Sequence, residues 1–257
     1  MRGLLLRVVL LLVVISLALT AWSQRHWFTT TIEQLHVSQR RSGPAPDLAT
    51  YQTLSMDLED HRKRLGQSYL KASIAPERED LLAQTRELLQ MSLPRLMRCW
   101  LGTPWDFNGT AHEPGTGKVA CGYFVSSVLQ DAGFEVEWAP LAQQASQNIL
   151  GTFLPPEKMT IRVVMDYDAF LQEVLLSGPG IYIVGLDSHV AFLVITGSRE
   201  IRFIHSSGSS PYCVIDEPRE HSHVLRNSEY RVIGNLTASD EVLHKWLLGE
   251  KFRTQTR

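Results

Sequence analysis

The stretch GPGIYIVGLDSHVAFLVITGSREIRFIH, residues 178–205, contains three runs rich in β-branched and aromatic residues. The runs are residues 181–186, 190–196 and 201–205. The turns between them are Asp187-Ser188 and Gly197-Ser198. Apolar runs joined by a few turn residues are typical of strands that pair with their neighbours in sequence. The stretch therefore predicts an antiparallel meander.

Patterns typical of helices precede this meander. Apolar residues recur at helical spacing in residues 54–72, 76–101, 121–132, 141–150 and 167–176. Gly133 is placed to end the third of these helices in the left-handed conformation, and we expect Pro94 to kink or restart the second. Two more strands and a final helix are expected at residues 213–215, 230–236 and 239–248. Because helices come first and strands follow, the predicted fold class is α+β.

Length, composition and net charge indicate a globular protein and argue against nucleic acid binding. The chain has 257 residues, of which 44% are hydrophobic and 20% charged, and this composition is typical of a globular protein. The 25 Lys and Arg residues and 27 Asp and Glu residues give a net charge of −2. That balance provides no general attraction to a nucleic acid backbone, so we expect no nucleic acid partner.

The first 23 residues have the pattern of an export signal. Arg2 and Arg7 flank the start of an apolar run, and Ala21 and Ser23 are small residues two apart, as a signal-peptidase site requires. The run is shorter than the about 20 residues of a spanning helix, although a retained membrane anchor is the alternative. We therefore expect an exported protein, whether periplasmic, secreted or membrane-anchored with its main domain outside the cytoplasm.

The remaining chain divides into four expected parts. They are a polar tether, a helical segment, a main domain of moderate size, and a C-terminal helix with a tail. Their bounds are residues 24–50, 51–94, 95–236 and 237–257.

The cysteines give the first indication of chemistry. Cys99, Cys121 and Cys213 are an odd number in a chain expected to meet an oxidising compartment, so at least one thiol stays unpaired. Cys121 opens a predicted helix, where free N–H groups and the helix dipole favour the nucleophilic thiolate. We therefore expect a pKa for Cys121 below its ordinary value, although a small core residue is the alternative interpretation.

Two histidines lie where strands can bring them together. His189 begins the second strand of the predicted meander and His205 ends the third. A nucleophilic thiol needs a base that also protonates the leaving group, and that base needs a third group to orient it. Cys121, His189 and His205 can fill these roles, whereas a lone histidine is more often a core or surface residue.

Four blocks carry a resemblance to a known family. They read LGTPW at 101–105, ACGYFV at 120–125, HVAFL at 189–193 and FIHSS at 203–207. In the same chain order they resemble the Gly-Thr-Pro-Tyr, Asp-Cys-Ser-Gly-Phe-Val, His-Val-Gly-Ile-Tyr and Phe-Ile-His-Ala-Ser segments of the NlpC-type branch of papain-like cysteine peptidases. Members of that branch are mostly bacterial cell-wall endopeptidases that act on peptidoglycan stem peptides. The resemblance covers about residues 101–214.

The resemblance implies a fold and a mechanism. The fold is a papain-like core, in which a nucleophile-bearing helix packs on an antiparallel sheet after a helical segment. Cys121 would be the nucleophile, His189 the general base and His205 the orienting residue, with the N–H of Cys121 in an oxyanion hole. The implied activity is hydrolysis of an amide or peptide bond in a peptide or peptidoglycan substrate, through a thioacyl intermediate. No cofactor and no metal are implied.

The expected substrate-binding residues depart from the family pattern. Ala120 stands where the family usually has Asp, Gly122 where it has Ser, and Trp105 where it has Tyr. In the family the Asp and Ser help to hold the amino end of the stem peptide, and the Tyr hydroxyl lies near the oxyanion site. Ser188, beside His189, completes the expected set. Because a carboxylate and a hydroxyl are missing, we expect the pocket to prefer an uncharged or bulkier group over a free amine.

Two other functions stay open from the sequence. One is acyl transfer to an amine, as in transglutaminase-like relatives that share the order Cys then His. The other is a binding module with a decayed site. A metal site built from His221 and His223 with Cys213 or His112 is less expected than a solvated loop.

Overall fold

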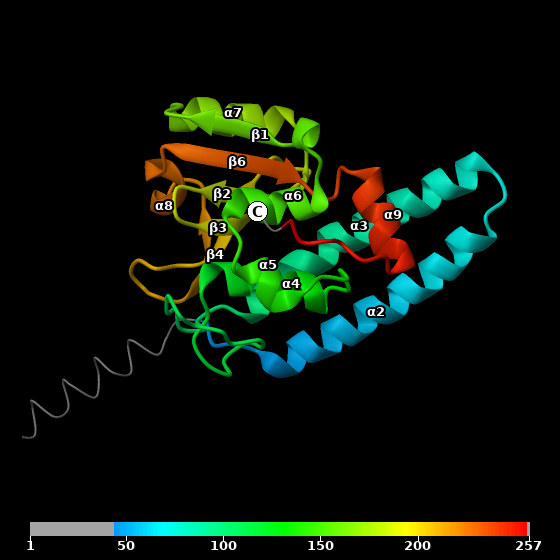
Figure 1. Ribbon diagram of the computed structural model, residues 1–257, viewed down its shortest axis with the longest axis horizontal. Helices are drawn as coiled ribbons and strands as arrows, with labels where there is room; N and C mark the ends of the chain where they lie inside the picture. The colour runs from blue at the N-terminus through cyan, green and yellow to red at the C-terminus, as the bar shows by residue number, and fades with distance from the viewer. Residues whose placement is uncertain (1–43, 256–257) are drawn as a thin grey trace, which may run out of the picture. The chain divides into compact units, whose positions relative to one another are not determined.

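The computed structural model describes residues 44–255, and from Ala45 onward the chain forms one compact unit (Figure 1). The expected signal peptide or anchor and most of the expected tether lie outside the described residues. Within the described range, no helix is long and apolar enough to cross a membrane.

An antiparallel sheet of six strands forms the centre of this unit. Its spatial order is β1-β6-β2-β3-β4-β5, and every neighbouring pair is antiparallel. The strands are β1 (Thr160–Val163), β2 (Gly180–Leu186), β3 (Val190–Ile195), β4 (Ile201–Ser206), β5 (Val214–Pro218) and β6 (Tyr230–Asn235). Strands β2, β3 and β4 are the predicted meander, which is confirmed. Strand β1, a short edge strand of mixed polarity, was not predicted from the sequence.

The helices agree with most of the predicted segments. They are α2 (Leu48–Lys71), α3 (Ala75–Cys99), α4 (Cys121–Asp131), α5 (Trp138–Ala142), α6 (Ser146–Phe153), α7 (Tyr167–Leu176), α8 (His223–Asn227) and α9 (Asp240–Leu248), with a 3₁₀ turn, η1, at Pro156–Lys158. The single helix expected over residues 141–150 is instead the pair α5 and α6, and α8 was not expected. The α+β class is confirmed.

Two boundaries near the start of the described chain differ from expectation. Helix α2 begins inside the expected tether, because the Asp47 side chain accepts the N–H of Thr50 at 3.0 Å and caps the helix. Helix α3 continues through Pro94 without restarting. The buried residues Leu89, Leu93 and Met97 hold it against the core on both sides of the proline. The boundary expected at residue 94 therefore falls inside a helix.

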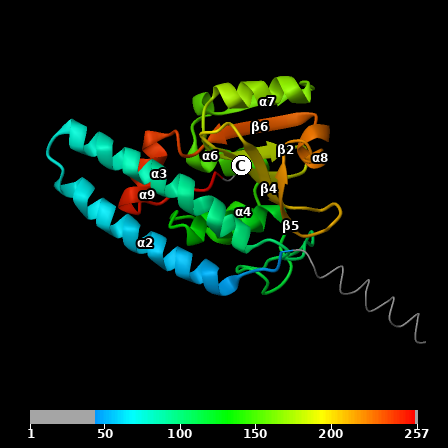
Figure 2. The same ribbon diagram turned by 180° about the vertical axis from the view of Figure 1, so that it is seen from behind.

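Helices cover both faces of the sheet (Figures 1 and 2). Helices α7 and α8 pack on one face with the odd-numbered residues of β3 and β4, such as Leu193 and Phe203. On the other face, the core includes α4 and α6 together with residues of α2, α3 and α9, among them Leu58, Leu93 and Trp246. The helical segment, the main domain and the C-terminal helix thus share one core.

Helix α4 is fixed in position by aromatic packing. Phe124 meets Trp100 and Phe192 edge to face, with ring centroids 5.8 and 5.9 Å apart. The helix ends as predicted at Gly133, whose φ of 88° is left-handed, and the N–H of Phe134 returns to the carbonyl of Leu129 at 3.1 Å. Because both ends of α4 are set, the position of its first residue is set as well.

Candidate active site

A cleft of about 630 Å³ opens where α4 begins. Six of the seven site residues predicted from the sequence line it, namely Trp105, Ala120, Cys121, Gly122, Ser188 and His189. The seventh, His205, is fully buried directly behind His189. The structure therefore brings all of the predicted site residues to one place.

Backbone hydrogen bonds hold the segment just before Cys121 in place. The N–H of Val119 donates to the carbonyl of Pro104 at 2.9 Å, and the N–H of Ala120 donates to the carbonyl of Gly109 at 2.9 Å. The hydroxyl of Ser206, at the end of β4, donates to the carbonyl of Val119 at 2.7 Å. The loop at 102–118 and the sheet thus both anchor the chain just before Cys121.

The turn that carries His189 is anchored through a carboxylate. Asp187 accepts the hydroxyl of Ser228 at 2.6 Å and the N–H groups of Glu229 and Tyr230 at 3.0 Å each. These bonds lower the pKa of the Asp187 carboxyl, chiefly through the Ser228 hydroxyl. The turn between β2 and β3 is therefore tied to the start of β6.

A row of three titratable side chains leads away from the cleft. Nε2 of His189 lies 2.9 Å from Nδ1 of His205, and Nε2 of His205 lies 3.3 Å from Oε2 of Glu217. Glu217 was not predicted from the sequence, because the predicted strand ended at residue 215, whereas β5 continues to Pro218. The register of β5 on β4 pairs Glu217 with Phe203, on the face that also carries His205.

Both histidines are held in the neutral form. Burial, with a smaller contribution from His205, lowers the pKa of His189 to about 3. Burial also lowers the pKa of His205, although the hydrogen bond and charge of Glu217 oppose that shift. At neutral pH each imidazole therefore carries one proton and offers one lone pair.

The thiol of Cys121 does not have the expected depressed pKa. Burial raises its pKa above the ordinary value, and the N–H groups of Val190, Gly122 and Cys121 itself oppose this only in part. The helix start acts in the expected direction, but the loss of solvent is the larger effect. The N–H of Val190, the residue after His189, is among these groups, so the thiol lies near the start of β3.

We expect the rate at which iodoacetamide alkylates Cys121 to rise steadily with pH, from about pH 6 to about pH 9. The thiolate is the reacting form, and the pKa of the Cys121 thiol is raised, so the thiolate fraction keeps growing over this range. The rate is measured by mass spectrometry of the Cys121 peptide, with Cys213 as the internal comparison, because burial raises its thiol pKa too. A rate that is already constant between about pH 5 and about pH 8 would instead indicate a thiolate–imidazolium pair.

Gly122 has a packing role that the sequence did not reveal. A Cβ atom at this position would lie 2.1 Å from the carbonyl oxygen of Ala142, at the end of α5. The space of the hydroxyl-bearing side chain usual in the resembling family is thus filled by backbone. Ala120 precedes α4 as its N-cap and makes no side-chain capping bond. Neither residue offers a polar side-chain atom to the cleft.

Aromatic and neutral polar groups make up the rest of the cleft wall. Trp105 lies against Gly208, where an added Cβ would come within 3.0 Å of the indole, and Phe107 is 79% exposed at the rim. The amide of Gln143 donates to the hydroxyl of Tyr123 at 2.8 Å. None of the cleft-lining residues is Asp, Glu, Lys or Arg.

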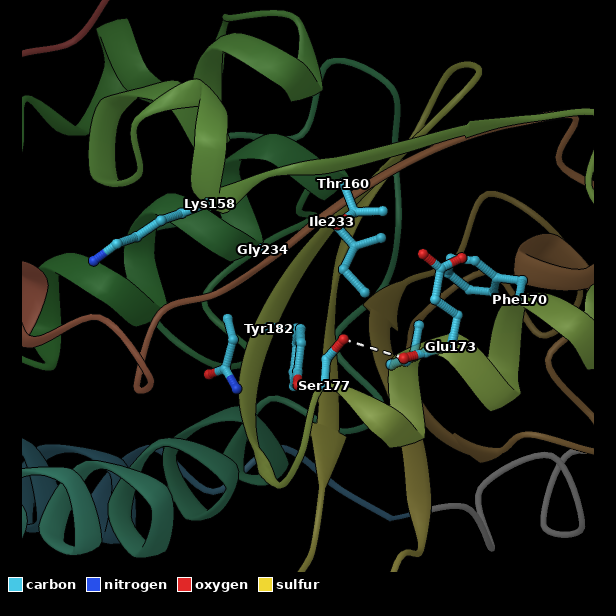
Figure 3. Close-up of a pocket in the computed structure, with 10 residues that line it drawn as sticks. Lys158, Thr160, Phe170, Glu173, Ser177, Tyr182, Ile233 and Gly234 are labelled. Atoms are coloured by element: carbon cyan, nitrogen blue, oxygen red, sulfur yellow. Dashed lines mark hydrogen bonds between the residues drawn. The ribbon is translucent and has the colours of Figure 1, made fainter.

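Other parts of the described chain offer weaker candidates. A second cavity of about 100 Å³ lies between α7 and the sheet and shares no residue with the cleft (Figure 3). The metal ligands considered from the sequence do not converge, since across residues 44–255 no three His, Cys, Asp or Glu side chains form a potential metal site. Cys99, Cys121 and Cys213 are all free thiols.

No family model matches this chain, and no curated protein matches its sequence.

Proposed function

We propose that this protein is a cysteine hydrolase with a papain-like core that cleaves an amide or peptide bond. The observation that carries the proposal is that a cysteine at the start of a helix and a histidine backed by a second histidine line one cleft. The chain order Cys121, His189, His205 and the packing of α4 on an antiparallel sheet support the papain-like assignment.

The proposed reaction uses the free ring nitrogen of His189. Because Nε2 is engaged by His205, Nδ1 is left for proton exchange in the cleft. Nδ1 takes the thiol proton as Sγ of Cys121 attacks the carbonyl carbon of the substrate. The resulting oxyanion accepts hydrogen bonds from unpaired N–H groups at the start of α4.

The second half of the reaction returns the enzyme to its starting state. The imidazolium of His189 gives its proton to the leaving nitrogen as the C–N bond breaks, and a thioacyl group remains on Cys121. Water then gives a proton to His189 and attacks the thioester carbon. The C–S bond breaks, the acid product leaves, and the proton returns to the thiol.

The lining of the cleft supports a substrate that is uncharged near the scissile bond. With no acidic side chain on the wall, a cationic amino end would lose hydration without gaining a partner. The resemblance suggests peptidoglycan stem peptides as the substrate class. Export through residues 1–23 belongs to the same proposal, because such a substrate lies outside the cytoplasm.

The test is mass spectrometry of muropeptides and simple peptides after incubation with residues 24–257, comparing wild type with Cys121→Ala. We expect cleavage by the wild type and none by the variant. Products linked to an added amine would favour acyl transfer instead of hydrolysis. Absence of any product, together with an unreactive Cys121, would favour the binding module.

A matched pair of substrates tests whether the cleft prefers an uncharged amino end. We expect kcat/KM for a cleaved peptide to be no higher with a free amino terminus than with an acetylated one. If the cleft held a carboxylate that paired with the amine, kcat/KM would be roughly one to two powers of ten higher for the free amino terminus. A preference of that size would contradict the proposed substrate class and leave the nucleophile assignment intact.

A further inference from the structure

We propose that Glu217 is a positioning residue that sets the tautomers of His205 and His189. Its placement fixes the proton on Nε2 of each ring and leaves Nδ1 of His189 free to receive the thiol proton. The role of Glu217 in turnover rests on the proposed hydrolase function, whereas its effect on the two tautomers does not depend on that function.

The contacts of His205 leave it few choices. Its ring is fully buried and packs against Phe203, with centroids 4.2 Å apart. Within the described chain, its ring nitrogens contact Nε2 of His189 on one side and Oε2 of Glu217 on the other. Burial removes water as a substitute partner, so these two contacts determine where the proton sits.

The donor and acceptor roles follow in order from the carboxylate. An ionised carboxylate only accepts hydrogen bonds, so Nε2 of His205 must carry the proton and donate it to Glu217. In the neutral ring, Nδ1 of His205 is then the acceptor, and Nε2 of His189 must donate to it. The second proton position of neutral His189 is therefore empty, and its lone pair on Nδ1 is free.

The reversed arrangement would disable the proposed base. If His205 carried its proton on Nδ1, that group would donate to Nε2 of His189, whose own proton would move to Nδ1. Two acceptors, Nε2 of His205 and the Glu217 carboxylate, would then face each other without a proton between them. His189 could no longer take a proton from Cys121 through Nδ1.

Glu217 is well placed to exert this control. Its side chain is only 22% exposed, and the adjacent strands β4 and β5 hold it on the same face as His205. Its charge also favours the imidazolium that forms on His189 during turnover, because His205 relays the hydrogen bond.

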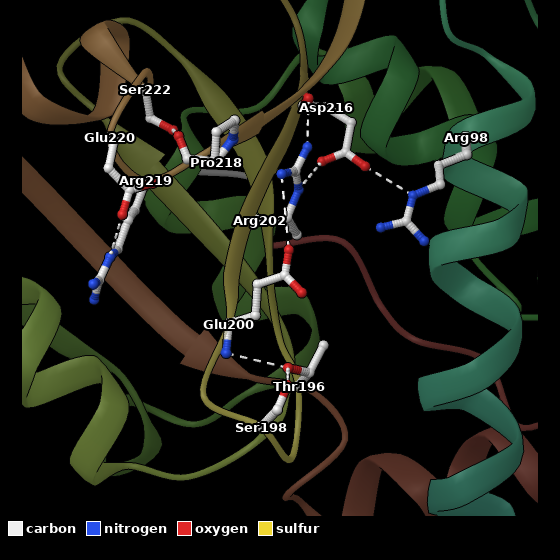
Figure 4. A network of polar contacts seen from close by, with 10 residues as sticks. All are labelled: Arg98, Thr196, Ser198, Glu200, Arg202, Asp216, Pro218, Arg219, Glu220 and Ser222. Carbon is white, nitrogen blue, oxygen red and sulfur yellow. Dashed lines mark hydrogen bonds and ion pairs between the residues drawn. The ribbon is translucent and has the colours of Figure 1, made fainter.

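The variants Glu217→Leu and Glu217→Gln distinguish the role of Glu217 as a hydrogen-bond acceptor from its role in packing. Leucine fills similar space without an acceptor, whereas glutamine retains an oxygen that can accept from Nε2 of His205. Asp216→Asn is the matched control from the neighbouring position. Figure 4 shows Asp216 between Arg202 and Arg98, which donate to it at 2.7 and 2.8 Å. The control thus removes an adjacent carboxylate that touches neither histidine.

The primary measurement is the nitrogen chemical shifts of the histidine rings in full-length protein labelled with ¹⁵N-histidine. A protonated ring nitrogen and a bare one differ widely in shift, and His189→Gln and His205→Gln assign the signals. We expect wild type, Glu217→Gln and Asp216→Asn to hold the proton on Nε2 of both rings. We expect Glu217→Leu to mix or reverse the tautomers.

Turnover provides the second measurement. We expect kcat of Glu217→Leu to fall about 10- to 100-fold with little change in KM, the size of loss seen when the hydrogen-bonded partner of a metal-bound histidine is removed, because Glu217 likewise acts through a histidine. Glu217→Gln should recover most of that loss. Unchanged ring shifts in a folded Glu217→Leu would overturn the inference. If wild type cleaves no substrate, the proposed function fails, and the ring shifts still decide the role of Glu217.

Discussion

His189→Ala is expected to lower kcat by about 10³- to 10⁴-fold, because no other side chain on the cleft wall can carry a proton between thiol and leaving group near neutral pH. His205→Asn is expected to lose far less, about 10- to 100-fold, the size of loss seen when the hydrogen-bonded partner of a metal-bound histidine is changed. An asparagine oxygen can still accept the Nε2 proton of His189 and so orient the base. Both losses in kcat are to be measured by steady-state kinetics on a peptide that the wild type cleaves.

An exposed histidine serves as the control for this comparison. His221→Ala removes a ring outside the cleft and should leave kcat unchanged. Circular dichroism establishes that each variant is folded. If folded His205 variants were as inactive as His189→Ala, the roles of base and orienting residue would be reversed.

Gly122→Ser is expected to destabilise the protein by about 1 to 3 kcal/mol, since a Cβ atom at 2.1 Å from the carbonyl oxygen of Ala142 forces backbone to move. Introducing the serine that is usual in the resembling family would therefore not introduce that family's substrate contacts. The displacement also reaches the adjacent Cys121, so activity should fall as well. The free energy of unfolding is measured by urea denaturation, in which an unchanged slope shows that stability alone has changed.

Ala120→Ser is the matched comparison, because it adds the same hydroxyl two residues earlier in the chain. Ala120 is the N-cap of α4 and has extended backbone angles, so a serine there can accept a free N–H of the first turn. We expect this variant to be more stable than wild type, by up to about 1 kcal/mol. If Gly122→Ser stabilised the protein as much as Ala120→Ser, the backbone of α5 would have to move easily away from a side chain at position 122.

The sequence predicted the parts of the fold that depend on local patterns. The alternation of apolar runs and short turns specified β2 to β4, and Gly133 marked the end of α4. The edge strand β1 and the short helix α8 have no such pattern, because neighbouring elements hold them in place. The start of α2 was missed because the tether and the helix have similar polarity near Asp47.

The candidate site was predictable in its residues but not in its electrostatics. Chain order and strand positions were enough to select Cys121, His189 and His205. The pKa of the thiol could not be predicted, because burial depends on what packs over the start of α4 from distant parts of the chain. Glu217 could be recognised only from the strand register, which the sequence does not specify beyond residue 215.

The carbonyls of Pro104 and Gly109 each accept a backbone hydrogen bond from the segment before Cys121, and these two bonds limit how this protein can be redesigned or can diverge. Residues 102–118 supply Trp105 and Phe107 to the cleft, and they also hold the backbone just before Cys121. A graft that exchanges this loop for a foreign one therefore exchanges a support of Cys121 along with part of the cleft wall. Only replacements that reproduce both carbonyl positions can alter the cleft wall while Cys121 keeps its place beside His189.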